Sequence, residues 1–217
     1  NKNDMGPGSL RGIIATACHG DTIRFSPTLL TAGVDSISLS TEIAFDDKAI
    51  VIKGLYTATD TLFISGANSS RIFSFNKADK VVLDSLVLIN GNGVGVVSSG
   101  SGGAVYYNDG LGSSSLHIIN TVIRNNSAND GGGIYFYSGT FLRTLISFTI
   151  TNSTLSNNLA TSNGGGVYSL SRSSTAITNS TLSNNLANIG GGVFSFNDYF
   201  STVTLTNSTL SNNSAFI

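Results

Sequence analysis

The sequence predicts an all-β fold: a parallel β-helix, or solenoid, of about six coils behind a short N-terminal capping helix. Three observations predict it. A polar unit recurs along the chain, apolar residues alternate inside each unit, and the alternation changes face within the unit. We expect one domain over residues 1–217, with the cap over 1–20 and the coils over 21–217.

The recurring unit is I-T-N-S-T-L-S-N-N, which occupies residues 150–158 and 177–185 and returns in part from Thr204. A degenerate copy occupies residues 118–126, and a weaker one places Asp84 where the first Asn belongs. Each copy is paired with a glycine-rich segment that leads into an apolar strand. The last copy reaches Ile217 before its glycines, so we expect either a piece of a longer solenoid or an assembly unit.

Each unit alternates apolar and polar residues as a β-strand does. Ile150 and Leu155 are separated by an odd number of positions, which cannot keep both on one face of a straight strand. A corner is therefore expected at Asn152-Ser153, because Asn tolerates the left-handed backbone that a corner requires.

Equivalent residues of successive coils are expected to stack in columns. Three columns would form the core: Ile118, Ile150, Ile177 and Leu205; Ile123, Leu155, Leu182 and Leu210; Val105, Ile134, Val167 and Val193. The corner asparagines are expected to form ladders of side-chain hydrogen bonds, at Asn120, Asn152, Asn179 and Asn207 and again at Asn157, Asn184 and Asn212.

The first residues differ from the repeats. Residues 9–18 space their apolar side chains as one face of a helix does, with Ser9 as the N-cap, and a strand follows from Thr22 to Phe25. Such a cap would cover the core and the unpaired strand edges of the first coil. The lone cysteine, Cys18, can form no internal disulfide, and we predict that it is a small buried residue.

The opening N-D-M-G-P-G-S-L-R-G-I-I, residues 3–14, and G-D-T-I-R-F, residues 20–25, resemble the start of bacterial surface proteins built on a right-handed parallel β-helix. The repeats N-S-T-L-S-N-N-x-A and G-G-G-[VI]-[YF] are similar to those of the same group and of polymorphic outer-membrane adhesins. The resemblance covers essentially the whole chain. It implies that the parallel β-helix is right-handed and that the protein is extracellular or on the cell surface.

Composition restricts the partners. Charged residues make up 11% of the chain and the net charge is −1, so the clustered Lys and Arg that nucleic acids and anionic membranes attract are missing. Between Thr144 and Ile217 there is one base, Arg172, and one acid, Asp198. No apolar run is long enough to span a membrane. We expect neither nucleic-acid binding nor membrane insertion.

Catalytic chemistry is weakly indicated. A glycoside hydrolase needs two carboxylates that face each other, and the one adjacent pair, Asp46-Asp47, is predicted to form a turn. Asp109, Asp130 and Asp198 occupy unlike positions in their coils. No calcium cluster is evident, and His117 is expected to face solvent rather than a metal. We therefore expect no enzyme activity and no cofactor. The alternative is a polysaccharide lyase or hydrolase that uses Asp46, Asp47 or Asp84.

An outward aromatic stripe is the strongest candidate for ligand contact. It consists of Tyr106, Tyr135, Tyr168 and Phe194, each one residue after a core position. Such a stripe can stack on sugars or dock a partner, or it can form a second small core beneath insertion loops. Columns of outward Thr are similar to ice-binding surfaces, although His117, Ile119 and Ala176 interrupt them. The sequence thus predicts a non-enzymatic extracellular rod, an adhesin or filament subunit, with end-to-end self-association or a glycan as its partner.

Overall fold

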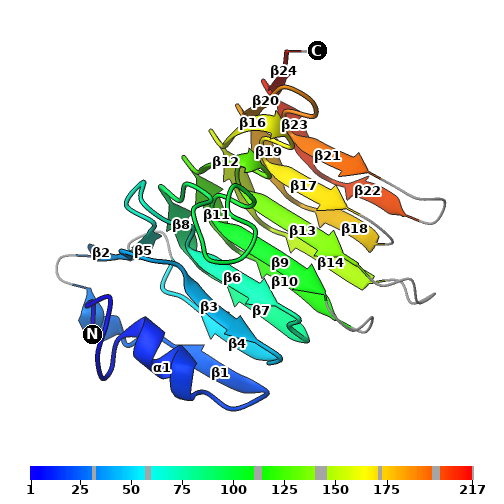
Figure 1. The fold of residues 1–217 in the computed structure, drawn as a ribbon. Helices are drawn as coiled ribbons and strands as arrows, with labels where there is room; N and C mark the ends of the chain where they lie inside the picture. Colours follow the sequence, from blue (N-terminus) through cyan, green and yellow to red (C-terminus); the bar gives the residue numbers. More distant parts are fainter. Residues whose placement is uncertain are drawn as a thin grey trace.

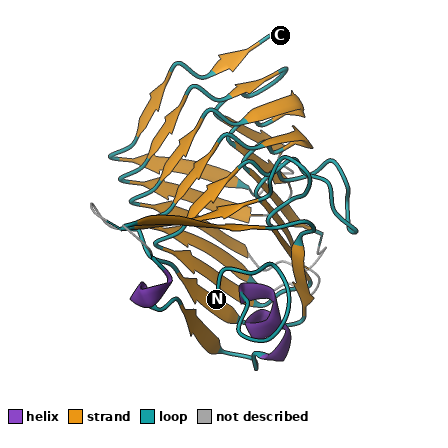
Figure 2. Ribbon diagram, turned by 90° about the vertical axis from the view of Figure 1, so that its left-hand side faces the viewer, coloured by secondary structure: helices purple, strands orange, loops and turns teal. Residues whose placement is uncertain are grey.

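The computed structural model describes residues 1–30, 33–56, 60–109, 114–139, 146–170, 173–196 and 201–216. Over these ranges the chain forms a parallel β-solenoid of about six coils, which rises from the N-terminus to the C-terminus in Figure 1. Each coil adds strands to several sheets that run side by side along the molecule (Figure 2). The predicted parallel solenoid is confirmed.

The described residues form four sheets, A to D, in which all neighbouring strands are parallel. Sheet A contains, in spatial order, β1 (Asp21–Arg24), β4 (Ile50–Lys53), β7 (Lys80–Asp84), β10 (Ser115–Ile119), β14 (Ile146–Thr151), β18 (Ser173–Thr178) and β22 (Thr202–Thr206). Sheet B contains β2 (Val34–Ser38), β5 (Thr61–Ser65), β8 (Val87–Ile89), β11 (Val122–Arg124), β15 (Thr154–Ser156), β19 (Thr181–Ser183) and β23 (Thr209–Ser211).

Sheet C closes the other side of the coils. It contains β3 (Ile43–Asp46), β6 (Phe73–Asn76), β9 (Val105–Asp109), β13 (Ile134–Ser138), β17 (Val167–Leu170) and β21 (Val193–Phe196). The short sheet D links sheet B to sheet C in the later coils, through β12 (Ser127–Asp130), β16 (Leu159–Asn163), β20 (Leu186–Ala187) and β24 (Ser214–Ala215).

Asparagines turn the chain from sheet A into sheet B, as predicted. Asn152 has φ of 50°, and its equivalents in neighbouring coils lie in the same left-handed region: Asn120, Asn179 and Asn207. A second row of left-handed asparagines ends sheet B: Asn125, Asn157, Asn184 and Asn212. Asn adopts this backbone more readily than other non-glycine residues, which explains why the corners repeat it.

Glycines make the corner that leads into sheet C. Gly131 has φ of 65°, and a Cβ atom built on it would lie 2.4 Å from the carbonyl oxygen of Ile134. Only glycine fits a left-handed position with the backbone so close. The equivalent positions in the other coils are also left-handed glycines: Gly102, Gly164 and Gly190.

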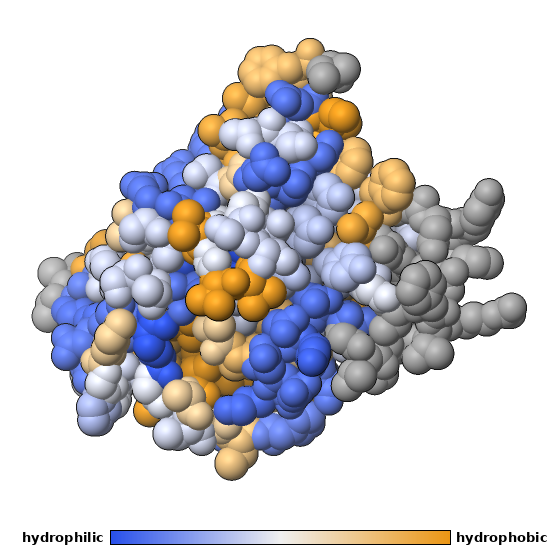
Figure 3. Space-filling model, in the orientation of Figure 1, coloured by the Kyte–Doolittle hydropathy of each residue, from blue (hydrophilic) through white to orange (hydrophobic). Residues whose placement is uncertain are grey.

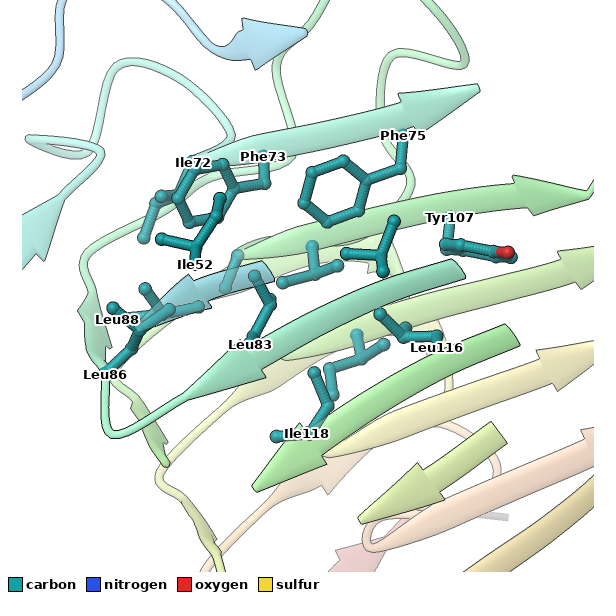
Figure 4. Packing of buried hydrophobic residues seen from close by; sticks show 14 of the residues in the cluster. Ile52, Ile72, Phe73, Phe75, Leu83, Leu86, Leu88, Tyr107, Leu116 and Ile118 are labelled. Carbon is teal, nitrogen blue, oxygen red and sulfur yellow. The ribbon is translucent and has the colours of Figure 1, made fainter. Parts of the chain in front are cut away.

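The three predicted core columns are confirmed by the strand register. Ile150 pairs with Ile118 and Ile177, Leu155 with Ile123 and Leu182, and Val167 with Ile134 and Val193. Within the stack the side chains of sheet C meet those of sheet A, as Phe73 and Phe75 do above Leu83 in Figure 4. Apolar surface buried along the whole stack is the main stabilising term of such a fold.

The helical cap is confirmed, with shorter bounds. α1 spans Leu10–Thr16, the Ser9 side chain accepts a hydrogen bond from the Gly12 N–H, and Leu10 and Ile14 are buried against the first coil. The prediction for Cys18 is wrong, since its side chain is exposed. Ala17 already has an extended backbone, so Cys18 lies in the turn beyond the last helical residue and not on the buried face. A 3₁₀ turn, η1 (Pro27–Leu29), follows β1.

Candidate functional site: the outer face of sheet C

The predicted aromatic stripe forms one continuous column. Tyr106, Tyr135, Tyr168 and Phe194 occupy equivalent positions in β9, β13, β17 and β21. Successive ring centroids are 5.5, 4.7 and 5.1 Å apart, and all three pairs are stacked face to face. Each ring therefore covers the face of its neighbour, and what the column turns outward is ring edges and phenol hydroxyls.

Exposure divides the stripe into two parts. Tyr106 is buried, with 3% of its surface exposed, whereas Tyr135, Tyr168 and Phe194 are half-buried. Tyr106 lies beneath a loop, as the alternative of a covered stripe predicts, and the other three rings reach solvent. Contact of these rings with a ligand stays a prediction. A sugar could not stack on the interior rings, because their faces are already in contact with one another.

The segment that covers Tyr106 is a loop of residues 92–101, here called the strap (Figure 1). The Ser98 hydroxyl lies 3.1 Å from the Tyr106 hydroxyl, and the Arg71 guanidinium lies 4.8 Å from the centre of the Tyr106 ring. The strap thus closes the lower end of the exposed stripe.

Arg71 fixes the strap. Its guanidinium donates hydrogen bonds to the carbonyl oxygens of Gly93, Val97 and Ser98, and it forms a 2.8 Å ion pair with Glu42. The second carboxylate oxygen of Glu42 accepts a 2.6 Å hydrogen bond from the Val96 N–H. The Arg71 side chain is 0% exposed and that of Glu42 is 3% exposed, so both ends of the pair are satisfied inside the protein.

The repeat pattern did not predict this cluster, although the sequence contains a signal for it. The register of β6 and β9 places Arg71 at the coil position that Gly103 occupies one coil later. Gly132, Gly165 and Gly191 hold this position in the following coils. An arginine at the position where the later coils have a glycine marks a coil whose corner is built differently from theirs.

A polar rim lies beside the exposed part of the stripe, where sheet D turns into sheet C. The Asp130 carboxylate accepts hydrogen bonds from the backbone N–H and the side-chain amide of Asn163, at 3.1 and 2.8 Å. The Thr161 hydroxyl donates a 2.8 Å hydrogen bond to the Asn129 side chain. The rim therefore presents hydroxyls, amides and one carboxylate next to the tyrosine edges.

Burial controls the charge state of the stripe. It raises the pKa of Tyr135 well above the ordinary value, and the nearby Tyr168, Tyr106 and Asp130 side chains raise it further. Burial and Asp130 also raise the pKa of Tyr168. Both phenols remain protonated throughout the physiological range and can donate hydrogen bonds to a ligand.

The asparagine ladder predicted at Asn120, Asn152, Asn179 and Asn207 is wrong for most of its length. All four side chains are exposed. The side-chain amide of Asn120 donates a hydrogen bond to Asp84, and that of Asn152 donates one of 3.4 Å to Asn120. No described hydrogen bond links Asn152 to Asn179 or Asn179 to Asn207, and none links Asn157, Asn184 and Asn212, because the left-handed residue at each corner turns its side chain outward.

The ladder lies one residue further along, at the second corner. Asn126, Asn158, Asn185 and Asn213 face the interior. The carbonyl oxygen of the Asn158 side chain accepts from the backbone N–H and the side-chain amide of Asn126, at 3.1 and 3.0 Å, and the next two pairs repeat this pattern. At the first corner, a serine hydroxyl in each coil accepts a hydrogen bond from a backbone N–H of the preceding coil. These serines are Ser153, Ser180 and Ser208. These ladders satisfy polar groups that the corners bury.

The carboxylates of the catalytic alternative are dispersed. Asp46 ends β3, and Asp47 follows in a left-handed turn; both are exposed. Asp84 forms a 3.0 Å ion pair with Lys53 on the face of sheet A. Burial works against its charge, yet hydrogen bonds from Lys53, Asn120 and Ser85 lower its pKa. Asp198 lies outside the described residues, as do Arg172 and Ile217.

In the parts of the chain that the structure describes, no three His, Cys, Asp or Glu side chains converge as a metal site. Asp109 is buried and accepts a 2.7 Å hydrogen bond from the Ser114 hydroxyl. Over the same ranges, the chain has no helix of the length and apolarity that a membrane crossing requires.

His117 is half-buried on sheet A, not fully solvent-facing as expected, and one ring nitrogen lies 2.8 Å from the Thr149 hydroxyl. Burial, and then the charge of Lys80, lowers the pKa of His117 below its ordinary value of 6.5. As the pH falls through 6.5, the unfolded chain therefore takes up a proton before the folded chain does. The stability that the neutral imidazole contributes is present above that pH and is lost below it.

Replacing His117 by Thr, the residue of this column in β14 and β22, should remove that dependence. We expect the free energy of unfolding of the native chain to fall between pH 7.5 and pH 5.5, and that of His117→Thr to change less over the same interval. Urea unfolding at the two pH values measures both. An equal slope in the two proteins would show that His117 does not carry the effect.

Comparison with known proteins places the chain in no family: no protein-family model, curated protein or solved structure matches it. The resemblance to bacterial β-helix surface proteins therefore stays a prediction.

Proposed function

We propose that this chain is a non-enzymatic structural and adhesive rod that acts outside the cell, as a surface adhesin or as a subunit of an extracellular filament. One observation carries the proposal: strands β9, β13, β17 and β21 of sheet C stack in register, so that equivalent outward side chains repeat at strand spacing along one face. A surface of this kind is suited to a partner that is itself repetitive.

The expected partner is a neutral, hydroxyl-rich polymer, a glycan. The outer face of sheet C presents phenol hydroxyls from Tyr135 and Tyr168, and the rim adds Asp130, Asn163 and Thr161. These groups donate and accept hydrogen bonds without the positive charge that would select phosphates. Several weak and equivalent contacts along one polymer add up through effective concentration.

A ligand should contact the edges of the rings and not stack on their faces, because the faces are stacked on neighbouring rings of the column. Binding should therefore depend on the hydroxyls. The double variant Tyr135→Phe and Tyr168→Phe keeps the stacked rings and removes the two hydroxyls. We expect it to bind a responsive polysaccharide about tenfold more weakly, since each lost hydrogen bond is worth about 0.5–1.5 kcal/mol.

The assay is retention on a panel of immobilised polysaccharides, with stability checked by thermal unfolding. Tyr56→Phe is the matched control, because Tyr56 is an exposed tyrosine outside sheet C. It should bind like the native chain. Unchanged binding by the double variant, or an equal loss in Tyr56→Phe, would rule out the stripe as the contact surface.

A further inference from the structure

The outer face of sheet A changes composition along the rod. In β14, β18 and β22 the strand register aligns three outward positions per strand, and all but one of these side chains carry a hydroxyl. These residues, here called the hydroxyl array, are Ser147, Thr149, Thr151, Ser174, Thr178, Thr202, Thr204 and Thr206. The exception is Ala176. The strands 146–151, 173–178 and 202–206 contain no charged residue.

The fold does not require hydroxyls at these positions. Earlier coils have other side chains in the same columns: Lys53 and Asp84 align with Thr151 and Thr178, and Lys80 aligns with Ser147. The preference of strands for β-branched residues would be met equally well by valine, which β4 and β7 use at outward positions. The hydroxyls are therefore a property of this part of the surface and not a consequence of building a coil.

The hydroxyl array repeats in two directions. Neighbouring strands lie about 4.8 Å apart, and alternate residues of a parallel strand lie about 6.6 Å apart. The pairing of β14 with β18 and of β18 with β22 runs without a shift in register, so the array is a regular net. Threonine is stiff about its first side-chain torsion, which holds most of the hydroxyls in fixed places on this net.

Two of the three residues that interrupt the threonine columns lie at the border of the array. His117 and Ile119 belong to β10, and a ring nitrogen of His117 lies 2.8 Å from the Thr149 hydroxyl. Within the array, the Thr202 hydroxyl donates a 3.4 Å hydrogen bond to the Ser174 hydroxyl. The array side chains of β14 and β18 are half-buried, so solvent reaches them between their neighbours.

Other faces of the rod lack an array of this size. Sheet B has hydroxyls at its outward positions in β15, β19 and β23, but only two per strand because these strands are three residues long. The face in view in Figure 3 is not uniform, since apolar patches lie among hydrophilic residues. A partner that needs a two-dimensional net of hydroxyls would therefore bind sheet A.

The chemistry of the array favours a partner that is a solid rather than a single molecule. A hydroxyl donates one hydrogen bond and accepts others, as a water molecule does, and the array has no charge that would keep its own hydration shell and counter-ions. A single glycan chain repeats in one direction only. The surface of ice presents water oxygens that repeat in two directions at spacings of similar size, so rows of ordered water can bridge the hydroxyls and the crystal.

We propose that the hydroxyl array on sheet A binds crystalline ice. Water ordered between the columns of hydroxyls joins the lattice of the crystal, and many equivalent contacts act together because the coils hold them on one rigid face. This activity goes beyond the proposed adhesive function. It uses a different sheet from the aromatic stripe, so either activity can be lost without the other.

Two matched variants test the assignment to sheet A. The double variant Thr151→Lys and Thr178→Lys places two charges in the array, in the column where β4 already has Lys53, so the fold accommodates the change. The control is Ser156→Lys and Ser183→Lys, in the same two coils but on sheet B, in the column that contains Arg124. Circular dichroism near the freezing point checks that both variants are folded.

The measurement is the partition of protein between a slowly growing ice crystal and the stirred liquid, with an unrelated soluble protein in the same solution as an excluded reference. We expect the native chain and the sheet B variant to enter the ice, and the sheet A variant to stay in the liquid with the reference. A native chain that is excluded overturns the proposal. So does a sheet A variant that enters like the native chain, or an equal loss in both variants.

Two further arms separate this result from other binding. The variant Tyr135→Phe and Tyr168→Phe should enter ice like the native chain, because the stripe lies on sheet C; its exclusion would contradict the assignment to sheet A. Retention on crystalline cellulose or chitin is measured in parallel. A native chain that is retained there and excluded from ice would overturn ice binding and identify a crystalline polysaccharide as the partner. Entry into ice without retention on any polysaccharide would support the array and refute the adhesive function.

Discussion

Replacing Arg71 by Met should lower the free energy of unfolding by about 3–5 kcal/mol, because it leaves the Glu42 carboxylate buried without its counter-ion. The guanidinium also holds three carbonyl oxygens of the strap. We therefore expect the strap to open as well, which would uncover Tyr106 and lengthen the exposed stripe by one ring. Urea unfolding gives the loss of stability, and hydrogen exchange over residues 92–101 reports the opening.

The double variant Arg71→Met with Glu42→Leu separates the two effects. It removes the unpaired charge, so part of the lost stability should return. The strap should stay open, since neither its carbonyl contacts nor the Val96 N–H contact is restored. A single variant that is as stable as the native chain, with the strap still protected, would refute the role assigned to Arg71.

Replacing Asn158 by Ala should cost about 3 kcal/mol or more. The change removes the acceptor of the Asn126 backbone N–H and side-chain amide and the donor to the Ile123 carbonyl oxygen. All of these groups are buried, and each one left unpaired costs about 1–3 kcal/mol. Chemical denaturation of the variant beside the native chain measures the loss.

Its neighbour Asn157 supplies the control. Asn157 is exposed and left-handed, with φ of 54°, a backbone that glycine adopts without strain. Asn157→Gly should therefore change the free energy of unfolding by no more than about 0.5 kcal/mol. If Asn158→Ala and Asn157→Gly lost equal free energy of unfolding, the loss would come from changing any residue of this corner and not from the hydrogen bonds of the interior ladder.

The sequence pattern predicted most of the fold because each coil of a solenoid repeats the same order of apolar and polar residues. The odd spacing of Ile150 and Leu155 located the corner at Asn152, and the shared unit aligned the columns that the register confirms. The sequence pattern could not show which of the two corner asparagines turns its side chain into the interior. A left-handed residue resets the alternation, so Asn157 points out and Asn158 points in, one position away from the predicted ladder.

The candidate site was predicted in part. One-residue offsets from the core column correctly placed the four aromatic rings on the outer face of sheet C. The stacking of their faces depends on rotamers and coil spacing, which the sequence pattern does not contain. The buried pair of Arg71 and Glu42 joins residues of different coils with a loop between them, and only the three-dimensional register brings them together.

We propose that this rod binds a glycan without cleaving it. The most direct test incubates the native protein with each polysaccharide of the panel. In the wells that retain the protein, cleavage of the polysaccharide is measured in two ways: as new reducing ends, which hydrolysis produces, and as unsaturated sugar, which a lyase produces. We expect the chain to be retained with no increase in either signal. New ends that disappear in Asp46→Asn, Asp47→Asn or Asp84→Asn would contradict it and identify a polysaccharide-cleaving enzyme.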